Sequence, residues 1–257
     1  MVDIHCHILP GIDDGSKSWE TTEAMCQIAA EDGITHIVCS PHANDEYKYD
    51  RSKNEELASQ LRERMGNTMR FSLGCDFHFS FENIQAALAN PAKFIIQGTD
   101  YLLVEFSDYA ISPGTEDALL RFRAMGITPI ITHPERNALL RQRPDAIAEW
   151  VEAGARVQVT AQSLLGDFGR RACDFCKLLL DRRLVHFVAS DAHDWQRRPP
   201  LLDRACHWVA EEYGDALAEA LFVTNPRAVL SGIPLDPSAL EVAPPSRKWY
   251  QIWRRSS

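Results

Sequence analysis

Short apolar runs recur along the chain, separated by longer segments in which apolar residues return every three or four positions. The short runs predict buried strands at 2–7, 34–39, 70–75, 101–106, 128–132, 156–160 and 185–190. The longer segments predict helices at 16–32, 53–65, 82–89, 116–125, 144–153, 170–183, 201–213, 215–223 and 226–230. This alternation indicates parallel strands joined by right-handed helical crossovers.

Seven strands alternating with helices over 257 residues predict an α/β fold, a distorted TIM-like (β/α)7 barrel. We expect residues 1–235 to form one barrel domain, because neither an internal repeat nor a linker interrupts the pattern. Residues 236–257 are basic and aromatic, and we expect a flexible C-terminal tail there.

The composition narrows the class of protein. Hydrophobic residues make up 45% and charged residues 25%, which is typical of a soluble globular chain. The formal charge of −9 argues against a nucleic-acid binder, which would normally carry a basic patch. No apolar run is long enough to span a membrane, and there is no secretory signal. The seven cysteines are scattered and suit reduced thiols, so we expect a cytoplasmic protein.

The candidate chemistry begins in the first strand, where His5 and His7 leave the same face and can meet on one ion while Cys6 points away. One such pair is a weak signal, but most of the other predicted strands also end in a potential ligand. Because strand C-termini share one mouth of a barrel, we expect these side chains to converge there. The candidate ligands at these strand ends are His5, His7, His42, Asp76, Glu105, His133, Asp191 and His193.

The types of ligand limit the metal. Imidazoles and carboxylates without thiolates suit zinc, manganese or iron(II), and this many ligands is too many for one ion. A carboxylate set in an apolar strand, such as Glu105, also needs a cation nearby. The sequence therefore predicts a cluster of divalent ions rather than a single site.

Several motifs then match a known family. They are His5-x-His7, Asp13-Asp14-Gly15, Ser40-Pro41-His42, Glu105-Phe106, His133-Pro134-Glu135-Arg136, and Ser190-Asp191-Ala192-His193 followed by Arg198-Pro199-Pro200. The series resembles the PHP (polymerase and histidinol phosphatase) superfamily. More narrowly, it is similar to the bacterial manganese-dependent protein-tyrosine phosphatases of capsule and exopolysaccharide operons. The resemblance covers residues 1–232.

The resemblance implies two or three divalent metal ions, with manganese expected and iron(II) or zinc left open. One ion would be held by His5, His7, Asp76 and Asp191, a second by Asp76, Glu105 and His133, and a third by Asp14, His42 and His193. Arg136 and Arg198 would act in catalysis and bind the phosphate, and Phe106 would help to bind the substrate. The departure is Asp76, where the family has glutamate, because a shorter side chain must bridge two ions.

The same resemblance implies the partners. The substrate would be a phosphotyrosine protein, the tail of a bacterial tyrosine kinase, with no nucleic acid and no membrane span. Whether the barrel is a homo-oligomer is left open. Three alternative functions also remain: a small-molecule phosphatase such as histidinol-phosphatase, an amidohydrolase-like C–N hydrolase, and a non-catalytic metal-binding scaffold.

Other signals have structural interpretations. The Cys176-x5-Arg182 spacing fits cysteine-dependent phosphatases, but its leucine run predicts a helix face rather than a phosphate loop. His36 and His186 lie among apolar neighbours, so we expect them in the core. His78 follows Asp76 by two residues and can reach the metal cluster, although the sequence favours its exclusion.

Overall fold

The structure is a computed structural model and describes residues 1–235. Its strands are β1 (Val2–Cys6), β2 (His36–Cys39), β3 (His42–Ala43), β4 (Arg70–Leu73), β5 (Asp76–His78), β6 (Tyr101–Glu105), β7 (Thr128–Thr132), β8 (Arg156–Thr160) and β9 (Phe187–Ala189). Its α-helices are α1 (Trp19–Glu31), α2 (Arg51–Met65), α3 (Phe81–Ala89), α4 (Thr115–Ala124), α5 (Pro144–Glu152), α6 (Ala161–Leu165), α7 (Arg170–Asp181), α8 (Asp203–Tyr213), α9 (Asp215–Glu219) and α10 (Asn225–Leu230).

The strands are all parallel and form two ladders, β1-β2-β4 and β3-β5-β6-β7-β8-β9. The second ladder continues the first, because β3 follows β2 and β5 follows β4 after short breaks. Across these breaks Gly74 N donates to Cys39 O at 2.8 Å and Asp76 N donates to Pro41 O at 3.0 Å. The predicted strands at 34–39 and 70–75 are therefore each followed by a second segment that carries the ligands.

The last strand meets the first at the mouth, which is the end of the barrel where the strands finish. Asp191 N donates to His5 O and His7 N donates to Ala192 O, both at 2.8 Å. The buried Asp3 carboxylate adds a polar link, accepting from the Ser190 hydroxyl at 2.5 Å and from its backbone N–H at 3.0 Å. These contacts join β9 to β1 and complete the circuit of strands.

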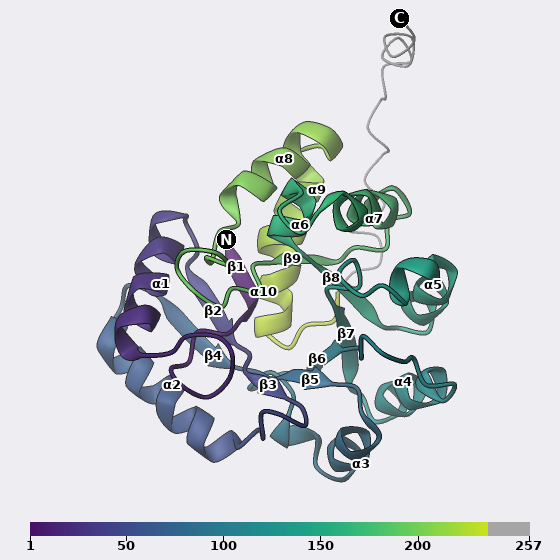
Figure 1. Ribbon diagram of the computed structural model, residues 1–257, viewed down its shortest axis with the longest axis horizontal. Helices are drawn as coiled ribbons and strands as arrows, with labels where there is room; N and C mark the ends of the chain where they lie inside the picture. Colours follow the sequence, from purple (N-terminus) through teal and green to yellow (C-terminus); the bar gives the residue numbers. More distant parts are fainter. Residues whose placement is uncertain (236–257) are drawn as a thin grey trace, which may run out of the picture.

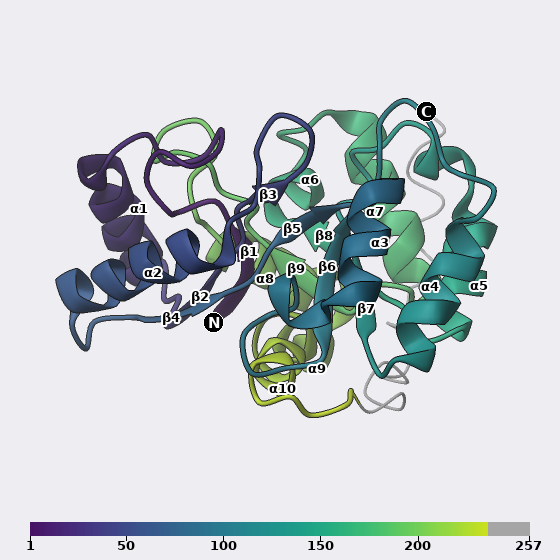
Figure 2. The same cartoon turned by 90° about the horizontal axis from the view of Figure 1, so that it is seen from below.

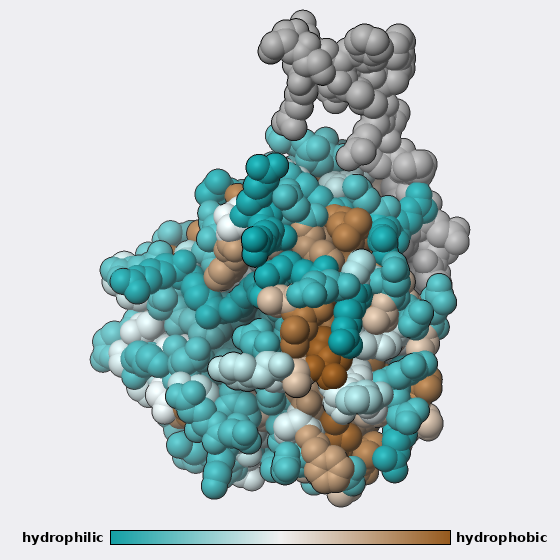
Figure 3. All heavy atoms as spheres, turned by 45° about the vertical axis from the view of Figure 1, so that its right-hand side comes forward, coloured by the Kyte–Doolittle hydropathy of each residue, from teal (hydrophilic) through white to brown (hydrophobic). Residues whose placement is uncertain are grey.

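The helices form an outer layer around the strands (Figure 1). Several begin at side-chain caps that the sequence supplies: Ser18 accepts from Thr21 N, Asp50 from Ser52 N, and Ser80 from Asn83 N. A large apolar cluster fills the space between the strands and these helices. The face seen in Figure 3 is mostly hydrophilic, with one band of apolar side chains.

A second apolar cluster lies inside the barrel, and we call it the floor cluster. It takes side chains from strands β1, β2, β6, β7 and β9 and from α10, which packs at the end opposite β3 (Figure 2). Its buried members are Val2, Ile4, Val38, Ile96, Tyr101, Leu103, Ile130, Phe187, Ala189, Val229 and Leu235. This cluster closes the lower half of the barrel and leaves the upper half for polar groups.

Two segments differ from the expected elements. The short helix α6 was not predicted, because its five residues are too few for a clear period. The expected helices at 215–223 and 226–230 run together through a π-helical segment, Ala220–Thr224, which accommodates Pro226 without a break. No helix within residues 1–235 is both long and apolar enough to cross a membrane. The predicted tail lies outside the described residues, and the division at residue 235 stays a prediction.

Candidate metal centre

Strand β1 delivers both histidines because its regular alternation breaks. Val2 and Ile4 belong to the floor cluster, so a regular strand would turn His5 away from the interior. The register with β2 shifts between Asp3 and Cys6, where one extra residue forms a bulge. His5 and His7 then both face inward, while Cys6 packs in the outer apolar cluster.

The two rings are arranged for a cation. His5 Nδ1 lies 3.0 Å from Gln158 Oε1, and His7 Nδ1 lies 2.8 Å from Asp13 Oδ2. Because both partners are acceptors, each Nδ1 carries a proton and each Nε2 is left to take a proton or a metal ion. These two Nε2 atoms are only 3.2 Å apart. Lone pairs at this distance repel unless a positive charge lies beside them, so the pair fits a metal ion.

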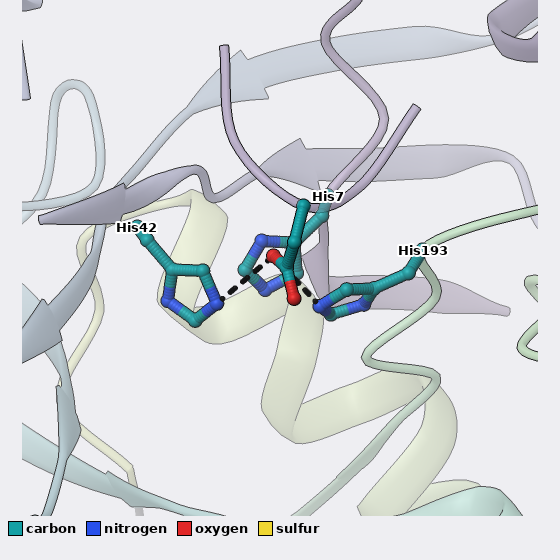
Figure 4. A group of neighbouring side chains, drawn as sticks. His7, His42 and His193 are labelled. Carbon is teal, nitrogen blue, oxygen red and sulfur yellow. Dashed lines mark ion pairs between the residues drawn. The ribbon is translucent and has the colours of Figure 1, made fainter. Parts of the chain in front are cut away.

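The nine candidate ligands all lie at the mouth, and we call them the mouth cluster. Their donor atoms fall into four groups in which all atoms lie within 4.8 Å of one another. The groups are His7, Asp14, His42 and His193; His5, His7 and Asp76; His5, His133 and Asp191; and His42, Asp76 and Glu105. In Figure 4 the rings of His7, His42 and His193 converge, and the dashed lines mark the ion pairs that His42 and His193 form with the Asp14 carboxylate. The sharing of residues between groups suits neighbouring ions.

Asp76 occupies a bridging place despite its short side chain. Its Oδ2 lies 3.6 Å from His5 Nε2 and 3.1 Å from His42 Nδ1, and it belongs to two of the four groups. Asp76 Oδ2 and His42 Nδ1 are both buried without a properly aligned hydrogen bond among the described residues. Buried polar atoms of this kind need a partner, and a cation between them would satisfy both.

The carboxylate of Asp191 connects the mouth cluster to two arginines. Its Oδ1 lies 3.5 Å from His5 Nε2 and 3.4 Å from His7 Nε2. Its Oδ2 accepts a hydrogen bond from Arg136 Nη1 and another from Arg198 Nη2, the latter at 2.7 Å. One oxygen therefore faces the histidines, and the other faces two guanidinium groups.

Two site residues have unusual backbones. His133 and Asp191 have φ angles of 32° and 49°, a region that residues other than glycine seldom adopt. Arg136 N donates to His133 O at 2.9 Å, and Arg141 Nη1 donates to the carbonyls of Glu135 and Arg136, so the turn after β7 is held by hydrogen bonds. Such strain is typical of residues that a fold holds in place for function.

The loop after β1 carries Asp14 into the mouth cluster, and Gly15 makes this path feasible. A Cβ atom at Gly15 would lie 2.2 Å from His7 O and 2.4 Å from His7 Cβ, so no larger residue fits without moving the loop. The neighbouring Asp13 accepts from Gly15 N at 2.9 Å and from His42 N at 3.1 Å. Asp13 thereby holds the loop that carries Asp14 and the backbone that carries His42.

Burial and the neighbouring charges shift the pKa values of several groups in the mouth cluster. Burial lowers the pKa of His5, but Asp76 and Asp191 outweigh it and raise the net pKa to about 9. Burial, opposed by the Asp191 charge, lowers the pKa of His133 to about 3. Burial raises the pKa of Asp76, yet His5 and His42 hold the net value well below its usual range. The Asp76 carboxylate therefore stays ionised at neutral pH and attracts cations.

Some predicted residues lie elsewhere. Phe106 is 6% exposed, and its ring stacks on Trp150 at 5.3 Å, so its part in substrate binding stays a prediction. His78 lies 3.8 Å from Glu105 at the margin of the site and is in none of the four groups. His186 is a buried core residue as expected, but His36 is only partly buried. Cys176 is buried in α7, which confirms that its spacing to Arg182 is incidental.

Sequence reasoning missed three supporting residues. Asp13 belongs to the Asp13-Asp14-Gly15 motif, and its position next to Asp14 was the signal in the sequence that could have identified it. Gln158 is a polar residue between two valines that pack outward, an alternation that points it inward. Phe168 had no signal, because it lies on the turn between α6 and α7 and reaches the arginines only in the folded chain.

Fold and site together define the class of protein: a parallel α/β barrel whose mouth gathers histidine and carboxylate groups that could hold metal ions. The chain belongs to the CpsB/CapC family of capsular polysaccharide synthesis, whose family model matches residues 1–231. It is 33% identical over 221 residues to the tyrosine-protein phosphatase YwqE of Bacillus subtilis, covering 84% of this chain and 87% of YwqE. It is 28% identical over 239 residues to the tyrosine-protein phosphatase CpsB of Streptococcus pneumoniae, covering 90% of this chain and 98% of CpsB. The family expected from the motifs is confirmed.

Solved structures agree. A crystal structure from work on YwqE and CpsB, described there as metal-dependent tyrosine phosphatases, matches with a TM-score of 0.86 at 32% identity. It covers 92% of this chain and 96% of the other, and it confirms the predicted barrel fold. A β-aspartyl dipeptidase from Fervidobacterium islandicum matches with a TM-score of 0.57 at 17% identity, covering 89% of this chain and 72% of that one, a likeness of fold alone.

Proposed function

We propose that this chain is a metal-dependent phosphohydrolase that removes phosphate from phosphotyrosine in proteins. The observation that carries the proposal is the placement of Arg136 and Arg198 on one oxygen of Asp191 while the other oxygen faces His5 and His7. A phosphate group bound between the cations and the arginines would meet positive charge on both sides. YwqE and CpsB are both named tyrosine-protein phosphatases, which supports phosphotyrosine proteins as the substrate class.

The mouth cluster is the proposed ligand set, with manganese as the proposed metal. When bound there, divalent cations activate a water molecule and offset the charge of the phosphate. Asp13 and Gln158 keep the rings of His7 and His5 in the tautomer that offers Nε2 to the metal. The division of the ligands among individual ions follows the resemblance and is part of the proposal.

Arg136 and Arg198 contribute phosphate binding and stabilisation of the transition state. Both can donate in pairs to the phosphate oxygens, orient the phosphorus for in-line displacement and stabilise the charge of the transition state. The leaving tyrosinate has a pKa of about 10, so a strong general acid is less necessary than for an alkyl phosphate. We further propose a cytoplasmic location and the tail of a bacterial tyrosine kinase as substrate; a homo-oligomer remains open.

The test compares substrates on one protein preparation. Manganese-loaded and chelated protein are incubated with a phosphotyrosine peptide, a phosphoserine peptide and histidinol phosphate. We expect turnover of the phosphotyrosine peptide only in the loaded protein, and its strong reduction in Arg136→Ala and Arg198→Ala. Arg170→Ala is the matched control, since Arg170 is exposed and its ion pair within residues 1–235 is with Asp174, away from the mouth cluster.

Other outcomes would redirect the proposal. Preference for histidinol phosphate would favour a small-molecule phosphatase, and an absence of turnover on all three would favour the scaffold. Full activity in both arginine variants would remove those residues from the mechanism.

A further inference from the structure

The turn between α6 and α7 places an aromatic ring beside both arginines of the mouth. The Arg136 guanidinium carbon lies 4.6 Å from the centre of the Phe168 ring, and that of Arg198 lies 5.8 Å from it. Both distances are within the range of a cation–π contact. The three residues come from separate loops, after β7, after α6 and after β9, so the contact exists only in the folded barrel.

The turn that carries Phe168 is well defined. Gly166 and Gly169 flank it with φ angles of 93° and 86°, which other residues seldom adopt. Asp167 N donates to Gln162 O and Gly169 N donates to Gly166 O, both at 2.9 Å. The backbone on both sides of Phe168 is thus fixed by hydrogen bonds.

The same region is tied to the loop that carries Arg198. Gln162 Nε2 donates to Arg197 O at 3.2 Å, which joins α6 to the loop after β9. Phe168 is itself partly buried. These contacts bring the loop that carries Phe168 and the loop that carries Arg198 together.

The two guanidinium groups need such support because they repel each other. Both donate to the same oxygen of Asp191, and the carboxylates of Glu135 and Glu105 add negative charge near Arg136. The negative face of an aromatic ring adds to this stabilisation without competing for the N–H groups that must bind phosphate. A carboxylate in the same place would occupy those N–H groups.

We propose that Phe168 is a positioning residue that sets the spacing and direction of Arg136 and Arg198 for phosphate binding. This inference deepens the proposed function and rests on it for the role of the arginines. Arginine side chains have many rotamers, and holding them before the ligand arrives reduces the entropy lost on binding. Phe168 therefore acts on phosphate affinity through the arginines.

The experiment measures phosphate binding as well as activity. Inorganic phosphate is titrated calorimetrically into manganese-loaded wild type, Phe168→Leu and Phe168→Tyr, and the metal content of each is measured. We expect Phe168→Leu to weaken phosphate binding about 10-fold, within the span that cation–π contacts produce. Phe168→Tyr, which keeps the ring, should stay within about 2-fold of wild type. The KM for p-nitrophenyl phosphate should follow phosphate affinity, with a smaller change in kcat.

Two controls separate positioning from general packing. Phe175→Leu makes the same change on the buried face of α7, where no arginine of residues 1–235 lies over the ring, and should lower stability without changing phosphate affinity. Adding Phe168→Leu to an Arg136→Ala, Arg198→Ala double variant should cause no further loss, because the effect passes through the arginines.

The inference is overturned if Phe168→Leu binds phosphate like wild type, if Phe168→Tyr loses as much affinity as Phe168→Leu, or if the loss persists without the arginines. It is also overturned if wild type binds no phosphate. If wild type binds phosphate but leaves the phosphotyrosine peptide intact, the proposed function fails while the comparison of Phe168 variants stands.

Discussion

On strand β6, Tyr101 and Leu103 pack in the floor cluster, whereas Glu105, two residues further on, faces the histidines of the mouth. Strand β9 repeats the pattern, since Phe187 and Ala189 lie in the floor cluster and Asp191 lies in the mouth cluster. The same inward faces of the same strands thus change from apolar to ionisable halfway along the barrel.

The difference follows from the groups that each end can satisfy. The floor is sealed by α10, so only apolar side chains can be buried there without a desolvation penalty. The mouth opens among loops that supply acceptors such as Asp13, and cations can enter to offset its carboxylates. We therefore expect substitutions at the mouth to reduce activity and those at the floor to reduce stability.

The largest effect should come from Asp76, the bridging carboxylate. Asp76→Asn keeps the shape but removes a charge from two ligand groups, and we expect kcat/KM to fall about 10³-fold, equivalent to about 4 kcal/mol. Steady-state kinetics and elemental analysis should show activity and bound metal falling together. Asp76→Glu restores the charge and should recover much of both. Unchanged metal content in Asp76→Asn would contradict the bridging role.

Asp13 tests the support of the mouth one step further out. Asp13→Asn weakens the hydrogen bond that fixes the tautomer of His7, and we expect a loss of about 10- to 100-fold in metal affinity or activity. Manganese titration followed by activity measures both. Excess manganese should recover part of the activity. An affinity equal to that of wild type would show that Asp13 is needed only for the backbone of its loop.

Val229 tests the floor. Val229→Ala leaves a cavity beside the strands of the interior, and we expect a loss of about 2 kcal/mol in the free energy of unfolding. Denaturant titration measures this loss, and kcat/KM at 25 °C should stay within about 2-fold of wild type because no ligand moves. A large loss of activity in folded protein would mean that floor and mouth are coupled.

The smallest effect concerns pH and a histidine below the mouth. Burial lowers the pKa of His186 to about 3, and its Nδ1 accepts from Val157 N at 3.2 Å. The unfolded chain takes up this proton near pH 6.5, so stability falls as the pH drops below 6.5 towards 3. Between pH 7 and 5.5 His186 should account for a loss of about 1 kcal/mol. In His186→Gln, the free energy of unfolding should fall by about 1 kcal/mol less between pH 7 and 5.5 than it does in wild type. An identical pH dependence in the two proteins would refute the assignment.

Much of the site was visible in the sequence because it depends on local order. Every ligand except Asp14 lies at or just after the end of a predicted strand, and strand alternation directs Glu105 and Asp191 inward after Leu103 and Ala189. The predicted barrel then brings strand ends together, which explains why distant segments could be assigned to one mouth before any coordinates. The predicted strands and most helices match for the same reason.

The rest depends on contacts between segments. The bulge in β1 turns His5 inward after Ile4, and it is visible only in the pairing of β1 with β2. The breaks before His42 and Asp76 have a similar origin: Pro41 has no N–H for the ladder, and a Cβ at Gly74 would lie 2.8 Å from Val38 Cγ1.

The sequence by itself determined the order of the strands, the types of ligand and the mouth at which they meet, because periodicity and residue chemistry are local properties. Only the tertiary structure decided which donor atoms share a group, that Asp191 faces histidines on one side and arginines on the other, and that Phe168 lies beside both arginines. Those arrangements join side chains from different loops, and the distances between such atoms depend on packing across the whole barrel.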